Sequence, residues 1–442
     1  MIFPRSVLRP PRREPGAAHV LSDLFALLLI IVTITGATTR EPLVAALGAT
    51  ALVVTAISRL WSRLSLEEVG YRREFSSDRI FAGDNVELSI VMENRKKLPV
   101  PWVRARDLIP DGLEASPSDN TRKHALGGTE LTVTTSLASQ ERVRSRYALT
   151  ARSRGYYRLG PARLESGDLF GLYTSRRDDP GGGGALVVYP VPVPLPDFYL
   201  PSARPGGDVR SNILLLADPN RPYGAREYRP GDPVKSIDWK ATARLDGLHV
   251  KTYEPSVSRY AVVVFDASTA ERPWDGYSRE ILEAGVTAAA SVAVRATALG
   301  YQVGLVTNGV PQSEESRMVI APAADPGQIA EMLRALAMVG PMTVKSIDEM
   351  VAPDGPSPLP FGATVVFVTG MLKQGPAEAI TRLSMSGHSV VLVWVGHSDP
   401  PSLHKVHVFD GRRIFGIRLP EDRFRRPSHG DDSRSSAEVT RA

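Results

Sequence analysis

The N-terminal part of the chain contains two closely spaced apolar runs. The first reads LFALLLIIVTITGA from Leu24 to Ala37, and the second reads LVAALGATALVVTAI and ends at Ile57. A helix over each run can cross about 30 Å of hydrocarbon, the second only just. The pattern predicts two transmembrane helices within residues 19–61, after a basic segment over residues 1–18. A cleaved signal peptide and a buried hairpin of a soluble protein are the competing interpretations.

Charges that flank the two runs predict their orientation. Arginines precede the first run and follow the second, whereas the connector carries only Arg40 and Glu41. Basic flanks stay in the cytoplasm. We therefore expect a multi-pass protein in the lipid bilayer with both termini and the main domains in the cytoplasm. Gly36 and Gly48 would permit close packing of the two helices.

Period-two alternation dominates residues 65–200. Apolar and polar residues alternate from Val86 to Met92, and similar short patterns follow at regular spacing. Such spacing without helical periodicity predicts a β-sandwich, a domain that binds partners or acts as a spacer. We expect a hairpin over residues 154–166, a flexible connection over residues 176–184, and a stiff, extended connection over residues 189–201.

Residues 260–420 alternate apolar strands with helical patterns. RYAVVVFDAS reads as a buried strand that ends at Asp266, and an Ala-rich helical pattern runs from Tyr277 to Leu299. Such alternation predicts a parallel sheet that helices cover on both faces. The polar, charged residues 421–442 predict a disordered tail.

Polar residues follow several of the predicted strands. Ligands of doubly wound sheets bind at the carboxyl ends of the strands, where the strand order reverses. This rule places Asp266, Ser268 and Thr269 at the mouth of the sheet, with Asn308 and Thr369 near it.

Composition limits the chemistry that the chain can perform. With 53 basic and 48 acidic residues, the net charge of +5 is too weak and too evenly spread to indicate nucleic-acid binding. The 442 residues include no cysteine, which excludes disulfides, thiolate nucleophiles and zinc–thiolate sites. The sequence contains no GxxxxGK[ST], HExxH or GxSxG motif. We therefore predict no catalytic residues.

The segment around residues 221–254 combines many charges with a single tryptophan. Residues 229–233 read RPGDP and predict a tight turn, and Trp239 is expected to anchor the segment by burial. The segment can form a surface that positions another protein, an anion site, or a network that fastens it to its own domain. The candidate residues are Tyr228, Arg229, Gly231, Asp232, Lys235, Asp238, Trp239, Lys240, Arg244 and Lys251.

This segment, EYRPGDPVKSIDWKATARLDGLHVKTYE, resembles the signature of the bacterial family called domain of unknown function 58. Lys235 stands where that family usually has Arg. SRGYYRLGP and GDLFGLY, at 153–161 and 167–173, resemble two further family elements, with Leu169 in place of Pro. The resemblance implies a signature segment over residues 201–259, a von Willebrand factor A-like (Rossmann-type) α/β domain over residues 260–420, and a MoxR-type AAA+ ATPase as partner. It also implies the bacterial cytoplasmic (inner) membrane as the location.

The same resemblance implies a metal-ion-dependent adhesion site after the first strand of this domain. Such a site holds Mg²⁺ through an Asp-x-Ser-x-Ser loop and residues of other loops. Here Ala270 takes the place of the second Ser, and Thr369 is followed by Gly-Met instead of by a carboxylate. Asp266 and Ser268 are therefore the candidate ligands of a degenerate site. We expect no resident cofactor, with weakly bound Mg²⁺ as the alternative.

These observations together predict a membrane-anchored, non-enzymatic interaction or scaffold protein. It would dock a cytosolic partner through residues 226–254 and the Asp266 loop. A Mg²⁺-dependent hydrolase or anion-binding enzyme that uses the Asp266 loop is the alternative from another class. A third possibility is a secreted binding protein whose first apolar run is cleaved.

Overall fold

The chain divides into two compact units, Met1–Pro190 and Val191–Ala442. The computed structural model describes residues 17–125, 127–180, 184–200, 217–230, 232, 234–245, 247–255, 260–272, 276–313, 316–356 and 359–418. Most of the predicted basic N-terminus, the predicted tail over residues 421–442 and the candidate residue Gly231 lie outside the described residues.

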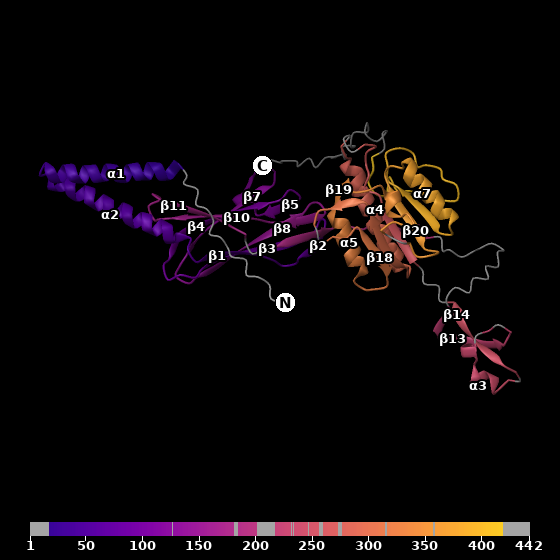
Figure 1. Ribbon diagram of the computed structural model, residues 1–442. Helices are drawn as coiled ribbons and strands as arrows, with labels where there is room; N and C mark the ends of the chain where they lie inside the picture. Colours follow the sequence, from indigo (N-terminus) through magenta and orange to yellow (C-terminus); the bar gives the residue numbers. More distant parts are fainter. Residues whose placement is uncertain are drawn as a thin grey trace, which may run out of the picture. The chain divides into compact units, whose positions relative to one another are not determined.

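The first unit begins with two long helices, α1 (Ala17–Thr38) and α2 (Pro42–Ser65), which run back along each other (Figure 1). They approach closely at two glycines, as predicted. A Cβ on Gly36 would lie 2.6 Å from the backbone nitrogen of Ala45, and one on Gly48 would lie 3.1 Å from Cα of Thr33. Any larger residue would force the helices apart.

Apolar side chains cover the outside of both helices. Leu43 is 77% exposed and Leu47 is 72% exposed. By length and composition α2 could cross a membrane, while the described apolar part of α1, Leu24–Thr38, is shorter. The two helices thus hint at association with a membrane.

The described residues of this unit form twelve strands after the two helices. They are β1 (Val69–Phe75), β2 (Arg79–Phe81), β3 (Asn85–Asn94), β4 (Val100–Ile109), β5 (Leu113–Ser116), β6 (Thr121–Lys123), β7 (Thr129–Leu137), β8 (Arg142–Ala151), β9 (Gly155–Arg158), β10 (Ala162–Gly167), β11 (Thr174–Asp179) and β12 (Ala185–Tyr189). The two larger sheets, ordered β1-β3-β8-β5 and β11-β10-β4-β7-β6, share one hydrophobic core and form a β-sandwich. Val86, Leu88 and Met92 lie in this core, as their alternation predicted.

Two predictions for this unit are wrong. The segment 154–166 is no hairpin, because β9 pairs with β12 whereas β10 pairs with β4 and β11. The segment 176–184 begins inside strand β11 and is no flexible connection there. Ion pairs between strands stabilise this charge-rich edge strand: Arg163 lies 3.3 Å from Asp178. Composition alone cannot reveal such pairing, because it depends on the neighbouring strand.

The C-terminus of α2 is fastened to the sandwich. The guanidinium group of Arg177 donates a hydrogen bond of 2.8 Å to the carbonyl oxygen of Leu66, and the Ser175 hydroxyl donates one of 2.6 Å to that of Ser62. The ammonium group of Lys96 donates to the carbonyl oxygens of Leu64 and Ser65. Positive groups near the C-terminus of a helix are stabilising, because that end of the helix dipole is negative. The helical pair and the sandwich therefore form one unit.

The second unit is a mixed α/β structure, as the alternation predicted. Its main sheet has the order β18-β16-β15-β20-β21-β22. The strands are β15 (Tyr260–Phe265), β16 (Gln302–Thr307), β18 (Val319–Ala323), β20 (Thr364–Thr369), β21 (Ser389–Trp394) and β22 (His407–Asp410). All neighbours are parallel except β18, which runs antiparallel to β16. The chain passes from β15 outward on one side and then returns to β20, so the strand order reverses between β15 and β20.

Helices cover both faces of this sheet. They are α4 (Arg279–Ala298), α5 (Gln328–Met338), α6 (Ile347–Met350) and α7 (Gln374–Met385). Phe265 contacts α4 at Gly285, whereas Phe367 lies in a core cluster with side chains of α6 and α7. α4 is also long and apolar enough to cross a membrane, but 67% of its apolar window is buried, which marks it as a core helix.

Two further strand pairs and two short helices belong to the described part of the second unit. β17 (Gly309–Pro311) and β19 (Val339–Thr343) form an antiparallel pair. β13 (Ala217–Glu227) and β14 (His249–Pro255) form another antiparallel pair, and the short helices η2 (Val234–Ser236) and α3 (Trp239–Thr242) lie between them in the sequence. We call the elements from β13 to β14 the signature hairpin.

The proline-rich segment over residues 189–201 does more than connect domains. The backbone N–H of Val193 donates a hydrogen bond of 2.8 Å to the Ser291 hydroxyl on α4. The ring of Phe198, which is 2% exposed, packs edge-on against Phe409 on β22 with centroids 5.3 Å apart. The segment therefore packs against the α/β unit. The sequence pattern did not predict which surface its apolar residues contact.

Candidate functional site

A cavity of about 330 Å³ opens where the strand order of the main sheet reverses. We call it the switch-point pocket. It is lined by Asp266, Ser268, Thr343, Val344, Lys345, Ser346, Glu349, Lys373 and Pro376. Asp266 and Ser268 follow β15, and Thr343 ends β19. The other lining residues lie between β19 and α6, within α6, or at the start of α7. General rules for doubly wound sheets place ligands at this position.

Hydrogen bonds hold Asp266 at the carboxyl end of β15. Its Oδ1 accepts one of 2.9 Å from the Asn308 side chain and one of 3.0 Å from the backbone N–H of Ser268. Its Oδ2 accepts one of 3.2 Å from the Thr369 hydroxyl. The carboxylate therefore ties together the ends of β15, β16 and β20, and the predicted meeting of Asp266, Asn308 and Thr369 is confirmed.

Asp266 is largely buried, and within the described residues no cation pairs with its carboxylate. The residue is 5% exposed, and burial raises the pKa of its carboxyl, while hydrogen bonds from Ser268, Asn308 and Thr369 act in the opposite direction. Thr269 takes no part in the pocket, because its hydroxyl accepts a hydrogen bond from the backbone N–H of Ser278.

The donor set does not fit a divalent cation. Mg²⁺ takes six oxygen ligands in a near-ideal octahedron and favours carboxylates. Both oxygens of Asp266 already accept hydrogen bonds from the protein, and Ala270 offers no hydroxyl. Within the described ranges, no three His, Cys, Asp or Glu side chains come together in a way that could hold a metal ion. Within the described residues, Asp266 and Ser268 are thus not part of a cluster of three acidic or histidine side chains.

Sequence analysis missed the two lysines of the pocket. Lys373 precedes α7 and Lys345 lies between β19 and α6. The strand-end rule could have identified Lys373, which follows the predicted strand β20 after three residues. Lys345 could not be found in this way, because the loop before α6 carries no strand pattern that ends near it.

The predicted turn of the signature hairpin is held by Asp232. Its carboxylate accepts two hydrogen bonds of 2.7 Å from the Arg226 guanidinium group and one of 2.9 Å from the backbone N–H of Arg229. The Arg226 hydrogen bonds lower the pKa of Asp232 to about 2. Asp232 therefore shapes the turn, as expected, and Arg229 contributes its backbone.

Trp239 is not the buried anchor that the sequence predicted. Asp238 caps the N-terminus of α3 by accepting hydrogen bonds from the backbone N–H groups of Lys240 and Ala241, at 3.0 and 3.1 Å. The Trp239 side chain is 67% exposed. A single helical turn on two strands provides no second layer to cover an indole, so the ring stays at the surface.

The other candidate residues divide into backbone and surface roles. The backbone N–H of Tyr228 donates a hydrogen bond of 2.8 Å to the carbonyl oxygen of Leu248, and Lys251 pairs with Ala225 across the strands. The remaining cationic side chains are exposed, and in the described part of the chain none of them has a carboxylate within ion-pair distance: Arg229, Lys235, Lys240 and Arg244.

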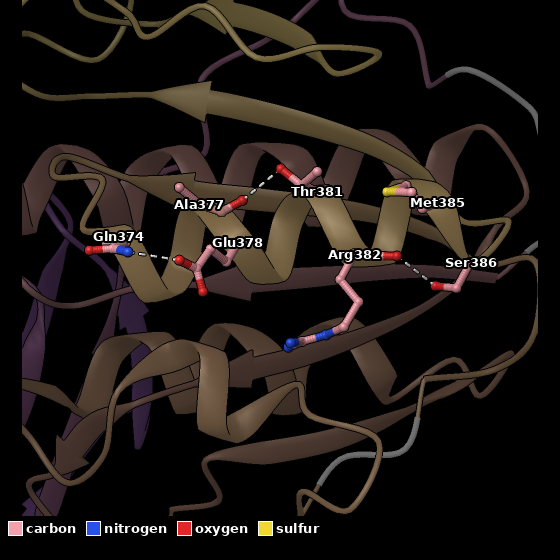
Figure 2. A pocket seen from close by; sticks show the side chains of 7 residues that line it. All are labelled: Gln374, Ala377, Glu378, Thr381, Arg382, Met385 and Ser386. Atoms are coloured by element: carbon pink, nitrogen blue, oxygen red, sulfur yellow. Dashed lines mark hydrogen bonds between the residues drawn. The ribbon is translucent and has the colours of Figure 1, made fainter.

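A larger but shallower hollow of about 670 Å³ lies along α7, and Figure 2 shows the seven side chains around it. Six of them belong to this one helix, and Ser386 follows its last residue. The Gln374 amide donates to Glu378 at 2.9 Å, and the Thr381 and Ser386 hydroxyls donate to carbonyl oxygens four residues earlier (Figure 2). Because these polar groups are satisfied within the helix, the hollow is not part of the candidate site.

Comparisons with known proteins support the resemblance over part of the chain. Residues 224–410 match the family described as "Protein of unknown function DUF58", a stretch that runs from within β13 to the end of β22. The protein described as uncharacterized protein YeaD of Bacillus subtilis (strain 168) is 23% identical over 332 residues, which cover 74% of this chain and 76% of that protein.

Solved structures offer only partial matches. The CARDB domain of a Pyrococcus furiosus protein, in complex with di-metal ions, is 15% identical, with coverage of 27% of this chain and 91% of that chain and a TM-score of 0.18. A cohesin module of a family 33 glycoside hydrolase from Clostridium perfringens is 13% identical, with coverage of 27% and 98% and a TM-score of 0.21. Scores this low carry no argument about fold or function.

Proposed function

We propose that this chain is a membrane-anchored, non-enzymatic interaction protein whose signature hairpin docks a cytosolic protein partner. One observation carries the proposal: the hairpin exposes apolar side chains next to Lys240 and Arg244, neither of which has a carboxylate within ion-pair distance in the described residues. The large exposed apolar residues are Val234 at 69%, Trp239 at 67%, Leu245 at 53% and Leu248 at 46%.

The composition of this surface supports a protein interface. Tryptophan and arginine are enriched at the centres of interfaces, where they supply much of the binding energy. Lys240 and Arg244 lie within five residues of Trp239 and are exposed. Such positive charges would steer an acidic patch of the partner toward the apolar residues. Since a two-stranded hairpin is only marginally stable alone, a partner would also stabilise it.

The helical pair supports a membrane anchor. Its outward-facing leucines would be covered by lipid, and basic residues flank both predicted spans in the sequence. The multi-pass topology, with both termini and the main domains on the cytoplasmic side of the inner membrane, follows from these flanks. Recovery of the full-length protein from the soluble fraction without detergent would contradict this part of the proposal.

The α/β unit supports the finer assignment to a von Willebrand factor A-like domain. Its strand order reverses between β15 and β20 with one antiparallel edge strand, β18, as in that class of domain. The resemblance to the domain of unknown function 58 implies a MoxR-type AAA+ ATPase as the partner, and we adopt that class of partner in the proposal. Asp266 then marks a degenerate adhesion site.

Retention of a purified ATPase tests the proposal. The full-length protein is immobilised in neutral detergent and incubated with the MoxR-type ATPase encoded in the same genome. We expect Trp239→Ala to lower the retained amount by about tenfold or more, as for an interface hot spot. Charge reversal at Lys240 or Arg244 should lower it by about fivefold, since an exposed charge contributes up to about 1 kcal/mol.

A matched control separates docking from folding. Phe361 is 68% exposed on the α/β unit, so Phe361→Ala removes a similar apolar side chain away from the hairpin. This variant should retain as much ATPase as the original protein, and the melting temperatures of all variants should be nearly the same. Equal retention by Trp239→Ala, or no retention by the original protein, would refute the proposal. Loss of folding in the hairpin variants would instead mean that these residues fasten the segment to its own domain.

A further inference from the structure

The turn between β10 and β11 exposes three neighbouring apolar side chains. The two strands form an antiparallel pair, and residues 168–173 connect them. Leu169 is 72% exposed, Phe170 is 68% exposed and Leu172 is 46% exposed. The first two are the most exposed large apolar side chains among the described residues of the sandwich. Apolar patches at a protein surface mark sites that another protein or a membrane covers.

Hydrogen bonds hold this turn in its shape. The Asp168 carboxylate accepts one of 3.0 Å from the backbone N–H of Phe170 and one of 2.7 Å from that of Tyr173. The indole N–H of Trp102 donates one of 3.2 Å to the carbonyl oxygen of Asp168. Asp168 and Tyr173 are buried. The turn therefore keeps its polar carboxylate inside and presents its apolar side chains to the outside.

Contacts with α2 show in which direction the turn points. Ser175 on β11 donates a hydrogen bond of 2.6 Å to the carbonyl oxygen of Ser62. Arg177, two residues later, donates one of 2.8 Å to that of Leu66. β11 therefore runs beside the end of α2 in the same direction, and the turn before β11 points back along α2 (Figure 1). Since a strand advances about 3.3 Å per residue and a helix about 1.5 Å, the turn lies level with α2 about one to two helical turns before Ser62.

This level of α2 is the end of the predicted transmembrane region, which extends to residue 61. The apolar side chains of Ile57 and Leu60 are exposed there. In a membrane-anchored protein, headgroups and the adjoining acyl chains surround a helix at this level, so a cytosolic protein has little access to the turn. Aromatic side chains are enriched at the same depth of a bilayer. The position of the turn thus favours lipid over a protein partner.

We propose that the turn over residues 169–172 inserts into the interface of the leaflet in which α2 ends, and gives the sandwich a second lipid contact. The inference rests on the membrane anchor of the proposed function. Because the inserted side chains are apolar, the contact depends on their removal from water and does not require anionic lipid. Two contacts, the helical pair and the turn, restrict the tilt of the sandwich over the membrane surface.

Spin labels test this inference. The chain contains no cysteine, so a single introduced cysteine carries the only nitroxide. Leu169→Cys and Phe170→Cys are labelled in the full-length protein and reconstituted in phosphatidylcholine nanodiscs. Electron paramagnetic resonance then compares the collisions of each nitroxide with oxygen and with a water-soluble nickel complex. We expect oxygen to have the greater access at both positions, at a depth of about 5–10 Å in the interface.

Two further positions provide the controls. Ser166, next to the turn, pairs with Val103 on β4, and Leu108 lies five residues further along that strand, away from the turn. Leu108 is also an exposed leucine, so the nitroxide of Leu108→Cys should be more accessible to nickel than to oxygen. The nitroxide of Ile57→Cys, on the exposed face of α2, should be in lipid.

A combined variant separates the native side chains from the label. Leu172→Cys carries the nitroxide, and Leu169→Ser with Phe170→Ser removes the two most exposed apolar side chains. We expect the nitroxide to move from lipid to water in this variant, while the melting temperature stays nearly the same because both replaced side chains are exposed. An unchanged depth would mean that the native side chains do not hold the turn in lipid, and would overturn the inference.

The inference and the membrane anchor can fail separately. Greater access of nickel than of oxygen at Leu169 and Phe170, with the Ile57 nitroxide in lipid, would refute only the inserted turn and would leave its apolar side chains to a protein partner. Greater access of nickel at Ile57 as well would refute the membrane anchor, and the inserted turn with it.

Discussion

The sandwich and the α/β unit each bury a carboxylate beside a strand, but they neutralise it differently. Asp107 on β4 accepts hydrogen bonds from the Arg73 guanidinium group, 2.9 Å to Oδ1, and from the Tyr71 hydroxyl, 2.8 Å to Oδ2. Burial and the nearby Asp107 charge raise the pKa of Tyr71. Among the described residues, only neutral groups donate hydrogen bonds to Asp266, and burial raises its pKa.

This difference separates a structural carboxylate from one at a candidate site. The charge of Asp107 is balanced inside a closed core, where the Arg73 and Asp107 side chains are 0% and 1% exposed. Within the described residues no cation contacts Asp266, and this residue lines a cavity that two lysines also line. Perturbed carboxylates in clefts are typical of functional sites, whereas closed ion pairs are typical of stable cores.

The largest effect in this comparison is expected in the sandwich. Asp107→Ala leaves the Arg73 guanidinium group buried without its carboxylate, and we expect the free energy of unfolding of this unit to fall by about 3–5 kcal/mol. Chemical denaturation in neutral detergent, followed by circular dichroism, measures the change.

An exposed ion pair of the same sandwich provides the control. Arg152 and Glu114 are 68% and 61% exposed, so Arg152→Ala should cost about 1 kcal/mol or less. If Asp107→Ala were no more destabilising than this control, the contrast between a closed pair and a surface pair would be wrong.

A smaller effect, with a distinct pH dependence, is expected at Asp266. Because its native pKa is raised above the usual 3.8, the folded protein holds this proton more tightly than the unfolded chain. The stability that results is fully present below pH 3.8 and is lost as the pH rises through the native pKa. Asp266→Asn keeps most of the hydrogen bonds, so it should remove this slope at a cost of about 1–3 kcal/mol at most. Melting temperatures at several pH values measure both quantities.

Asp107→Asn provides the matching substitution in the sandwich. It removes the ionic partner of a buried guanidinium group, so it should destabilise the protein more strongly than Asp266→Asn at neutral pH. An unchanged pH slope in Asp266→Asn would show that another group causes it. A larger loss in that variant than in Asp107→Asn would reverse the comparison.

The smallest effect is expected at Asp232, a carboxylate at the surface of the signature hairpin. The Arg226 hydrogen bonds lower its pKa from 3.8 to about 2, so its contribution to the turn is present above pH 3.8 and is lost as the pH falls toward 2. We expect the ¹³C signal of the Asp232 carboxyl to titrate near pH 2. In Arg226→Gln the pKa of Asp232 should rise toward 3.8, while the hydrogen bond from the backbone N–H of Arg229 still lowers it. An identical titration in both proteins would exclude this ion pair in solution.

Predictions from local pattern were most accurate where burial follows strand or helix period. The alternation around Val86 to Met92 identified the buried face of β3, and the Ala-rich pattern after Tyr277 identified the core helix α4. The strand-end rule also brought Asp266, Asn308 and Thr369 together. These successes share one cause, since each depends on residues whose spacing along the chain directly sets which face they occupy.

Predictions failed where a contact depends on a distant part of the chain. Trp239 has the composition of an anchor, but whether an indole is buried depends on a second layer that its own segment does not provide. The charged segment at 176–184 begins as a strand because β10 supplies its partners. Pattern alone contains neither piece of information.

The sequence by itself determined the apolar helical pair, the period-two strands, the α/β alternation and the polar residues at the strand ends. Only the tertiary structure decided that Asp107 is paired with Arg73 inside a core, whereas Asp266 lines a cavity. It also decided that Lys345 and Lys373 line that same cavity. The physical reason is that periodicity reports which side of an element is buried, whereas charge balance depends on which elements meet in space.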